Sequence, residues 1–414
     1  MNAEIAPPVP QSTSKFAAVY KVLSNAIAAR AFPGCAFGVL AGGKVVLQDA
    51  MGQFTYEAGS PPVTPETVYD LASVTKVVAT TAAAMLLYQR GLFNPDALLG
   101  DVLPEFVSGR SHSDSARPIK LRHLLAHNSG LPGYVEFFRT ATTPSELLSA
   151  CLHLSLEAEP GARAEYSDPG FILLGKALEV LISEADLGDS LPAFVQREIF
   201  EPLGMISTGF SPLPEARAQI PPTEEDKSYR KRRIQGEVQD ENAWLLEGAA
   251  GHAGLFSNVP DLLRFANQIL NSVSRKIPAA NTANLFHPYT VQLFAERQGP
   301  MDNSHALGWD TPSKKSSSGR HFSPHSIGHL GYSGCSLWID LEAGIAAVLL
   351  TNRTWPDRKN QLHRKVRPAF HNAVREALAR MDSYYPLKRT VYSRILSSLA
   401  HFANRIKNWG QTRC

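Results

Sequence analysis

Residues 336–352, SLWIDLEAGIAAVLLTN, decide the fold of this 414-residue chain. Two apolar runs, Ser336–Asp340 and Ile345–Asn352, lie on either side of the turn residues Glu342-Ala343-Gly344. Short apolar runs separated by a glycine-containing turn are typical of paired antiparallel strands. This stretch therefore predicts a β-hairpin close to the C-terminal end of the chain.

A second hairpin is predicted near the other end. Cys35–Leu40 and Lys44–Gln48 are apolar runs around Gly42-Gly43. Helical spacing of apolar residues from Phe16 onward predicts an amphipathic helix that ends before Pro33. Strands thus occur at both ends of the chain and helices between them. We therefore expect an α+β fold, with one antiparallel sheet formed from both chain ends, flanking helices and an inserted, mainly helical lobe.

The remaining elements follow from apolar periodicity and from proline and glycine breaks. Helices are predicted at Val68–Leu92, Leu121–Ala126, Pro144–Leu152, Gly170–Leu181, Pro260–Leu270 and Pro368–Met381. The highly charged residues 221–242 predict an exposed loop. The boundaries we expect are a disordered arm at 1–15, one domain at 16–382 and a tail at 383–414. Within the domain, the sheet part takes about 16–70 and 326–382, and the helical lobe about 71–325.

The composition indicates a globular protein. The chain is 44% hydrophobic and 19% charged, which excludes fibrous and disordered classes. The first ten residues are polar and proline-rich and show no secretory signal. No apolar run reaches the roughly 18 residues that a membrane span needs. We therefore expect a cytoplasmic protein.

Ser73-Val74-Thr75-Lys76 is the first candidate for chemistry. On the predicted helix, Ser73 and Lys76 share a face, so the amine lies within hydrogen-bond reach of the hydroxyl. A desolvated lysine has a lowered pKa and can take the proton of a serine, which becomes a nucleophile. The alternative interpretation is a capped helix with a surface lysine. The motif alone is a weak signal, because Ser12-Thr13-Ser14-Lys15 also matches it.

Two further segments carry residues suited to the same chemistry. Tyr166 precedes a predicted helix, and a phenol held near phenolate can relay a proton to a leaving group. The alternative is a packing tyrosine beside an Asp168 cap. Residues 329–332, His-Leu-Gly-Tyr, precede a predicted strand. A backbone N–H there, together with that of Ser73, would form an oxyanion hole; the alternative is a glycine-rich turn with an incidental histidine.

Five segments occur in a fixed order: LASVTK at 71–76, LLAHNSGLP at 124–132, YSD at 166–168, GHAGLFS at 251–257 and HLG at 329–331. This order resembles the penicillin-recognising serine hydrolases, which include class C β-lactamases, D-alanyl-D-alanine carboxypeptidases, D-aminopeptidases and related esterases. The resemblance covers about residues 16–380. It implies a β-lactamase-like fold.

The resemblance also implies a role for each matching residue. Ser73 would be the acylated nucleophile, Lys76 its activator and Tyr166 the proton shuttle. The amides of Ser73 and Tyr332 would hold the oxyanion. No metal or organic cofactor is needed, because these groups supply the catalytic elements. The residues expected to shape the lobe beneath the cleft are His127 and 251–257.

Around the expected cleft, the sequence departs from the family pattern at two positions. His329 and Gly331 match the triplet that lines the cleft, but Leu330 replaces its usual threonine. The missing hydroxyl removes a hydrogen bond to a substrate carboxylate, worth about 1–3 kcal/mol. Asp168 replaces an asparagine, and a carboxylate near Lys76 would raise the pKa of the lysine unless it points away into a cap. An ester, or an amide lacking that carboxylate, is therefore favoured over a penicillin or a D-Ala-D-Ala peptide.

The sequence thus predicts a serine hydrolase that acts on a small-molecule or peptide-like acyl substrate through an acyl-Ser73 intermediate. The alternative hypothesis is a penicillin-binding or acyl-sensing module of the same fold that does not turn over. Asp168 and Leu330 motivate that alternative. The residues leave open which base activates the deacylating water, and Tyr166 is the first candidate.

Two other patterns point to binding functions that we do not expect. His321, His325 and His329 recur every four residues, which on a helix would align metal ligands. A proline and a glycine interrupt this run, so we expect no metal site. The basic residues 227–233 are flanked by acidic ones, which indicates a solvated loop rather than a nucleic-acid contact.

The tail from 384 to 414 is a separate feature. It holds six basic residues and no acidic one. Its apolar residues recur at steps of four and three, which predicts a basic amphipathic helix: Val391, Ile395, Leu399, Phe402, Ile406 and Trp409. Such a helix can lie on an anionic membrane surface. Docking onto the body of the chain or onto a second copy is the alternative.

Overall fold

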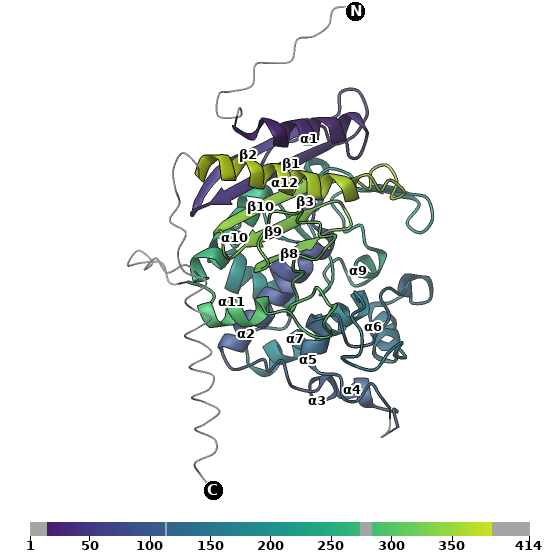
Figure 1. Ribbon diagram of the computed structural model, residues 1–414. Coiled ribbons are helices and arrows are strands. Elements are labelled where there is room, and N and C mark those ends of the chain that lie inside the picture. Colours follow the sequence, from purple (N-terminus) through teal and green to yellow (C-terminus); the bar gives the residue numbers. More distant parts are fainter. Residues whose placement is uncertain (1–14, 112–113, 274–283, 383–414) are drawn as a thin grey trace, which may run out of the picture.

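The computed structural model describes residues 15–111, 114–273 and 284–382. Its main feature is a five-stranded antiparallel sheet in the order β2-β1-β10-β9-β8 (Figure 1). The strands are β1 (Gly34–Ala41), β2 (Lys44–Gly52), β8 (Ser326–Leu330), β9 (Ser336–Asp340) and β10 (Ile345–Thr351). The predicted α+β class, with a sheet formed from both chain ends, is confirmed.

The central pairing joins the two ends of the chain. β1 pairs with β10 from Cys35↔Thr351 to Ala41↔Ile345. Both strands are almost completely buried, because other elements cover the two faces of the sheet. Their sequences accordingly read as continuous apolar runs. Both predicted hairpins, β1–β2 and β9–β10, are confirmed.

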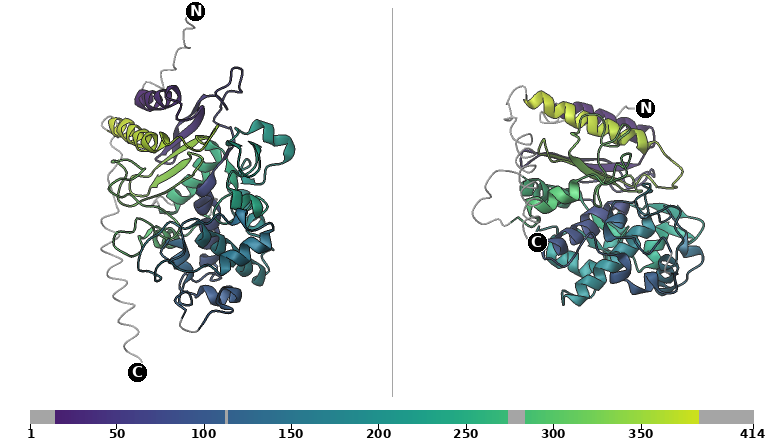
Figure 2. Two further views of the ribbon diagram at one scale, coloured as in Figure 1. Left: turned by 90° about the vertical axis from the view of Figure 1, so that its right-hand side faces the viewer. Right: turned by 60° about the horizontal axis from the view of Figure 1, so that its bottom comes forward.

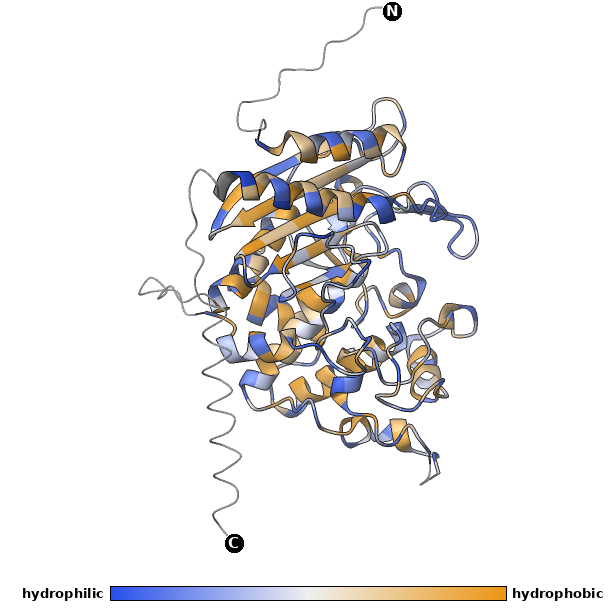
Figure 3. Ribbon diagram, viewed as in Figure 1, coloured by the Kyte–Doolittle hydropathy of each residue, from blue (hydrophilic) through white to orange (hydrophobic). Residues whose placement is uncertain are grey.

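Two helices from opposite chain ends cover one face of the sheet. α1 (Ala17–Ala28) and α12 (His363–Asp382) lie side by side across it (Figure 1, Figure 2). Figure 3 shows apolar strands beneath α12, a helix in which hydrophilic and apolar residues alternate. One side of α12 is buried in the core beneath it, through Phe370, Val374 and Leu378. The helix begins five residues earlier than the sequence predicts.

The opposite face of the sheet carries α10 (Val259–Val273), which contacts β1 and β10, and below it the helical lobe (Figure 2). Gly38 of β1 lies against α10: a Cβ there would come within 2.5 Å of Val259 Cγ1 and 2.8 Å of Leu263 Cδ1.

The remaining α-helices are α2 (Ala82–Gln89), α3 (Leu99–Val102), α4 (Pro104–Val107), α5 (Leu121–Leu125), α6 (Pro144–Leu152), α7 (Asp168–Glu184), α8 (Leu191–Val195), α9 (Glu241–Leu245) and α11 (Pro288–Ala295). Short 3-10 or π-helical segments are η4 (Phe137–Arg139), η5 (Gln196–Phe200) and η6 (Pro214–Gln219).

The single helix predicted at 68–92 is wrong in its first half. Ala72 adopts a φ of +47°, a left-handed conformation through which a right-handed helix cannot continue. The segment is instead β3 (Tyr69–Asp70), η2 (a 3-10 turn, Ala72–Val74), η3 (a π-helical turn, Lys76–Thr81) and then α2. β3 pairs with β7 (Leu255–Ser257), which also pairs with β4 (Gly209–Phe210).

The exposed loop predicted at 221–242 is also wrong. The segment contains a two-stranded hairpin, β5 (Glu224–Asp226) and β6 (Arg232–Ile234), and ends in α9. Glu224 and Glu241 are buried, and both pair with Arg358, which is more than a hundred residues away in sequence. A local count of charge cannot predict such a distant partner, so the segment resembled a solvated loop.

The predicted tail, and the predicted arm apart from Lys15, lie outside the described residues. The domain boundaries therefore remain predictions. Within the described part of the chain, no helix combines the length and apolarity needed to cross a membrane.

Replacing Gly38 with alanine should destabilise the protein, because the new methyl group overlaps Val259 and Leu263. Overpacking of this kind costs about 1–3 kcal/mol. Urea denaturation measures the loss as a lower midpoint at constant slope. The matched control is Gly209→Ala, where the new Cβ meets its nearest neighbour at 3.9 Å and the expected change is under about 1 kcal/mol. Equal stabilities of the two variants would contradict the close packing of β1 on α10.

Candidate active site

Ser73 lies on a backbone held in an unusual shape. The residue before it, Ala72, has the left-handed φ of +47° noted above. Asp70 supports this turn, since its Oδ1 accepts a hydrogen bond from the amide of Ala72 at 2.8 Å. Thr75 supports it from the other side by donating to the carbonyl of Ala72 at 2.6 Å. Strained backbone retained by such contacts is typical of functional positions.

Lys76 is completely buried, and its amine has three acceptors. Its Nζ donates to Ser73 Oγ at 3.0 Å, to Asp168 Oδ1 at 2.7 Å and to the carbonyl oxygen of His252 at 3.0 Å. The His252 ring is in turn held 2.9 Å from Asp240 Oδ1. The predicted pairing of Ser73 with Lys76 is therefore present in the geometry, but it is made across successive 3-10 and π-helical turns.

Asp168 faces the lysine and does not cap its own helix. Ser167 caps α7, because its Oγ accepts the amide of Gly170 at 3.1 Å. The interpretation of Asp168 as a helix cap is therefore wrong. Its carboxylate is free to pair with Lys76, which is the arrangement expected to raise the pKa of the amine.

The charges within the site set the protonation of Lys76. Burial alone would lower its pKa, but the charge of Asp168 and the hydrogen bond to that carboxylate act in the opposite direction, and the pKa is raised above its ordinary value. Burial also raises the pKa of Tyr166, although the nearby Lys76 opposes this. At neutral pH the resting site therefore holds a protonated amine and a neutral phenol. One of them must lose a proton before it can act as a base.

Tyr166 lies over the amine. Lys76 Nζ is 4.9 Å from the centre of the Tyr166 ring. The ring is also packed against His127 and His329, with centroids 4.5 and 5.9 Å away. Burial lowers the pKa of His329 to about 3 and that of His127 well below its ordinary value, so neither ring is a cation at neutral pH. Lys76 is therefore the cation that acts on this phenol.

These residues open into one pocket of about 500 Å³. Its lining contains the predicted site residues Ser73, Tyr166, His329, Leu330, Gly331 and Tyr332. Lys76 and Asp168 lie behind Ser73, bonded to it or to each other. The structure thus brings the predicted residues together from β8, the turn after it, η2, η3 and the start of α7.

The turn after β8 lies against the segment that carries Ser73. A Cβ at Gly331 would be only 2.3 Å from the carbonyl oxygen of Leu71, two residues before Ser73. Among the described residues, the Tyr332 amide donates no hydrogen bond to a backbone carbonyl. Ser73 and Tyr332 line the same pocket, which is what an oxyanion hole formed by their two amides requires.

Sequence reasoning missed most of the far wall of this pocket. That wall contributes several arginine, lysine and histidine side chains and one partly buried acid: His305, Asp310, Lys315, Arg353, His363, Arg364 and Arg367. Five of these lie in loops or in α12, where no motif or spacing marks them.

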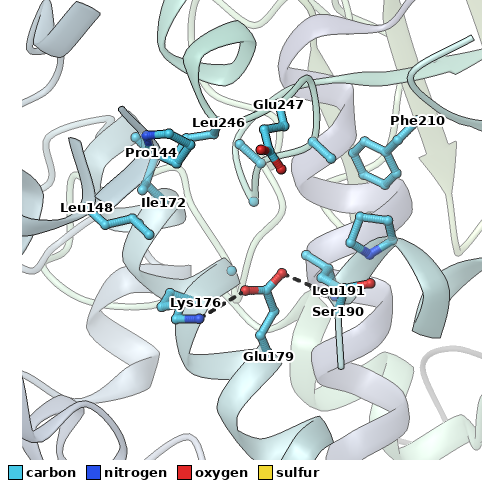
Figure 4. Close-up of a pocket in the computed structure, with 15 residues that line it drawn as sticks. Pro144, Leu148, Ile172, Lys176, Glu179, Ser190, Leu191, Phe210, Leu246 and Glu247 are labelled. Atoms are coloured by element: carbon cyan, nitrogen blue, oxygen red, sulfur yellow. Dashed lines mark hydrogen bonds and ion pairs between the residues drawn. The ribbon is translucent and has the colours of Figure 1, made fainter. Parts of the chain in front are cut away.

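A second pocket, of about 380 Å³, lies on the other side of α7 and is lined by none of the predicted catalytic residues (Figure 4). Its side chains include Lys176 and Glu179, which pair at 3.5 Å, and Glu247 facing them. Its floor reaches Gly251, whose carbonyl accepts a hydrogen bond from Thr80 at 2.6 Å. It shares no lining residue with the pocket of the candidate active site.

The three histidines with fourfold spacing do not form a helix. His329 is in strand β8, and the other two precede that strand. In the described part of the chain, no group of three or more His, Cys, Asp or Glu side chains is arranged to hold a metal ion.

The chain belongs to the Beta-lactamase family, whose model matches residues 19–369. It is 29% identical over 372 residues to the N-acetylmuramyl-L-alanine amidase of Bacillus subtilis (strain 168), covering 83% of this chain and 82% of that protein. Its fold is shared with EstCE1, a hydrolase with promiscuous acyltransferase activity, at a TM-score of 0.68 and 22% identity. That match covers 88% of this chain and 99% of EstCE1. A penicillin-binding protein homologue from Caulobacter crescentus shares the fold at a TM-score of 0.68 and 16% identity. That match covers 91% of this chain and 100% of the homologue. The predicted family and the β-lactamase-like fold are therefore confirmed.

Asp168→Asn should move the acid limb of the pH–rate profile to lower pH. The Asp168 charge raises the pKa of Lys76, so its removal lowers that pKa and leaves more neutral amine at a given pH. The limb reports the coupled ionisation of Lys76 and Tyr166 rather than either group alone. The measurement is kcat/KM for ester hydrolysis between neutral and alkaline pH.

The matched control for this experiment is Asp261→Asn, which also removes a buried carboxylate, one that pairs with Arg264 on α10. It should lower stability without moving the limb. An unshifted limb in Asp168→Asn would show that the amine does not control the rate.

Proposed function

We propose that this protein is a serine hydrolase that acts on an ester or amide through an acyl-Ser73 intermediate. One observation carries the proposal: the buried amine of Lys76 lies 3.0 Å from Ser73 Oγ, at the base of a pocket that Tyr166 also lines. Nucleophilic catalysis by serine needs a base within this distance and an accessible hydroxyl.

The proposed reaction has two halves. In acylation, Ser73 Oγ attacks the acyl carbonyl, and its proton passes to the base, which is either neutral Lys76 or the Tyr166 phenolate. The negative charge that develops on the carbonyl oxygen is stabilised by the amides of Ser73 and Tyr332. The leaving group then departs with a proton returned from the same pair. In deacylation, water attacks the carbonyl of the acyl-serine and gives its proton to the base, for which the Tyr166 phenolate is the candidate; the base then returns a proton to Ser73 Oγ as the acid is released.

The substrate we propose is a small-molecule or peptide-like acyl donor that does not depend on a carboxylate next to the scissile bond. Leu330, at the end of β8, lines the pocket where a hydroxyl would bind that carboxylate. The named activities of the relatives, an amidase and a hydrolase with acyltransferase activity, support an acyl substrate of either ester or amide type.

A second candidate function is an acyl-sensing module that is acylated but does not turn over. The 2.7 Å pair between Lys76 and Asp168 favours it, because a protonated amine is a poor base for the water that must deacylate the serine. The two candidates agree on the nucleophile. They differ in the lifetime of the acyl-enzyme.

Ser73→Ala should abolish hydrolysis of p-nitrophenyl acetate, measured by release of p-nitrophenol. The matched control is Ser333→Ala, a buried serine in the turn after β8. Its hydroxyl contacts Cys335 Sγ at 3.4 Å rather than the pocket, so most activity should remain. Undiminished hydrolysis by Ser73→Ala would defeat the assignment.

The time course of labelling by a fluorescent penicillin and a fluorophosphonate separates the enzyme from the sensor. Rapid penicillin labelling followed by release indicates an enzyme, whereas a stable penicillin adduct on Ser73 indicates a sensor. Absence of label with both probes would contradict both functions.

Leu330→Thr should shift specificity toward substrates that carry the carboxylate. The added hydroxyl supplies a hydrogen bond to a charged group, worth about 1–3 kcal/mol, or roughly a tenfold gain for a typical case. The measurement is the ratio of benzylpenicillin acylation to p-nitrophenyl acetate hydrolysis. The matched control is Leu330→Val, because valine has nearly the same shape as threonine but no hydroxyl. This variant should leave that ratio low. Equal ratios in the two variants would show that this position does not contact the carboxylate.

A further inference from the structure

Arg367 is a buried arginine of α12 whose side chain is directed at the turn after β8. Its Nη2 donates to the carbonyl oxygen of Gly331 and, at 3.0 Å, to that of Cys335. Its Nε donates to the carbonyl oxygen of Gly334 at 3.1 Å. One guanidinium thus holds three carbonyls of a single five-residue turn.

No carboxylate among the described residues forms an ion pair with Arg367. Burial, with Arg353 and Arg364 nearby, lowers its pKa to about 9, so the group remains charged at neutral pH. A buried charge is costly unless it is well solvated by hydrogen bonds. The carbonyl dipoles of the turn provide that solvation, so the position of the turn and the position of the guanidinium depend on each other.

One of these bonds acts on the candidate oxyanion hole. The carbonyl of Gly331 and the N–H of Tyr332 belong to the same peptide unit, which is planar and trans, so they point in opposite directions. Because Arg367 holds the oxygen toward α12, the N–H is directed to the other side of the turn. Ser73, Gly331, Tyr332 and Arg367 all line the same pocket.

A second bond to the turn provides a useful contrast. Arg353 donates to the carbonyl of Tyr332 at 2.7 Å. That oxygen belongs to the next peptide unit, whose N–H is that of Ser333. Arg353 therefore supports the turn without holding the peptide that carries the Tyr332 N–H.

We propose that Arg367 is a positioning residue for the oxyanion hole: through the Gly331 carbonyl it fixes the orientation of the Tyr332 N–H and strengthens it as a donor. A hydrogen bond accepted by one end of a peptide unit polarises the unit and strengthens the bond made by the other end. This inference deepens the proposed function and rests on it.

The test compares Arg367→Lys with Arg110→Lys. Arg110 is a matched control in the helical lobe, because it too donates to three backbone carbonyls, those of Phe106, Leu152 and Leu154, at 2.7 to 2.9 Å. Both variants should lower Tm. Arg367→Lys alone should reduce the acylation rate of Ser73 by p-nitrophenyl acetate, by roughly 10- to 100-fold, which is less than the loss of an entire oxyanion donor. KM should change little, since the donor acts on the transition state.

The outcomes separate this inference from the function on which it rests. A wild-type acylation rate in Arg367→Lys, with a lowered Tm like that of Arg110→Lys, means that Arg367 is structural and overturns the inference alone. Absence of acylation in the unmodified chain overturns the proposed function and this inference with it.

A measurement on the unmodified chain covers the case in which no Arg367 variant folds. In protein labelled with 15N-tyrosine, the Tyr332 amide resonance is identified by its loss in Tyr332→Phe. Binding of a phenylboronic acid to Ser73 places a negative oxygen in the hole and should move this resonance downfield. A Tyr332 amide that does not respond to the boronate overturns the inference, because the peptide held by Arg367 would then not be the donor.

Discussion

The site depends on one buried amine and the three oxygens around it. Lys76 has no exposed surface, and its Nζ is shared between Ser73 Oγ, Asp168 Oδ1 and the carbonyl of His252. A buried amine without such partners would lose its charge or destabilise the fold. The same three contacts determine the protonation state of the Lys76 amine in the resting site. Asp168 keeps the amine protonated, and Ser73 is positioned to use it once that proton is lost. The contact that stabilises the site is therefore also the one that restrains its activity.

The fold brings these groups together by pairing the two ends of the chain. β1 and β10 join at the centre of the sheet, and this places the edge strand β8 beside the turn that carries Ser73. The helical lobe, inserted between the strands, supplies Tyr166 and Asp168 at the start of α7. Neither half holds a complete site. The buried arginines of the C-terminal part then fix the turn after β8, so that the pocket wall and the sheet are stabilised by the same packing.

Much of this could be predicted from the sequence. Both main hairpins and α6 follow from local apolar patterns, and the resemblance of five ordered segments identifies the family. The predictions that failed concerned features that depend on contacts with residues distant in the sequence. The helix expected at 68–92 begins late, because Ala72 is held in a left-handed turn by Asp70 and by contacts with β7. Glu224, in the charged hairpin at 224–234, is buried and pairs with the distant Arg358. The orientation of Asp168 could not be predicted because Ser167 and Asp168 are equally suited to cap a helix. Arg367 carries no motif, and only its tertiary contacts reveal its position.

The central claim is that Ser73 forms the covalent intermediate, and mass spectrometry of the protein quenched during turnover of p-nitrophenyl acetate tests it most directly. The account predicts an acetyl group on the peptide that contains Ser73, gained while p-nitrophenol is released and lost as the substrate runs out. Release of p-nitrophenol with the acetyl group on another residue, or on none, would contradict it.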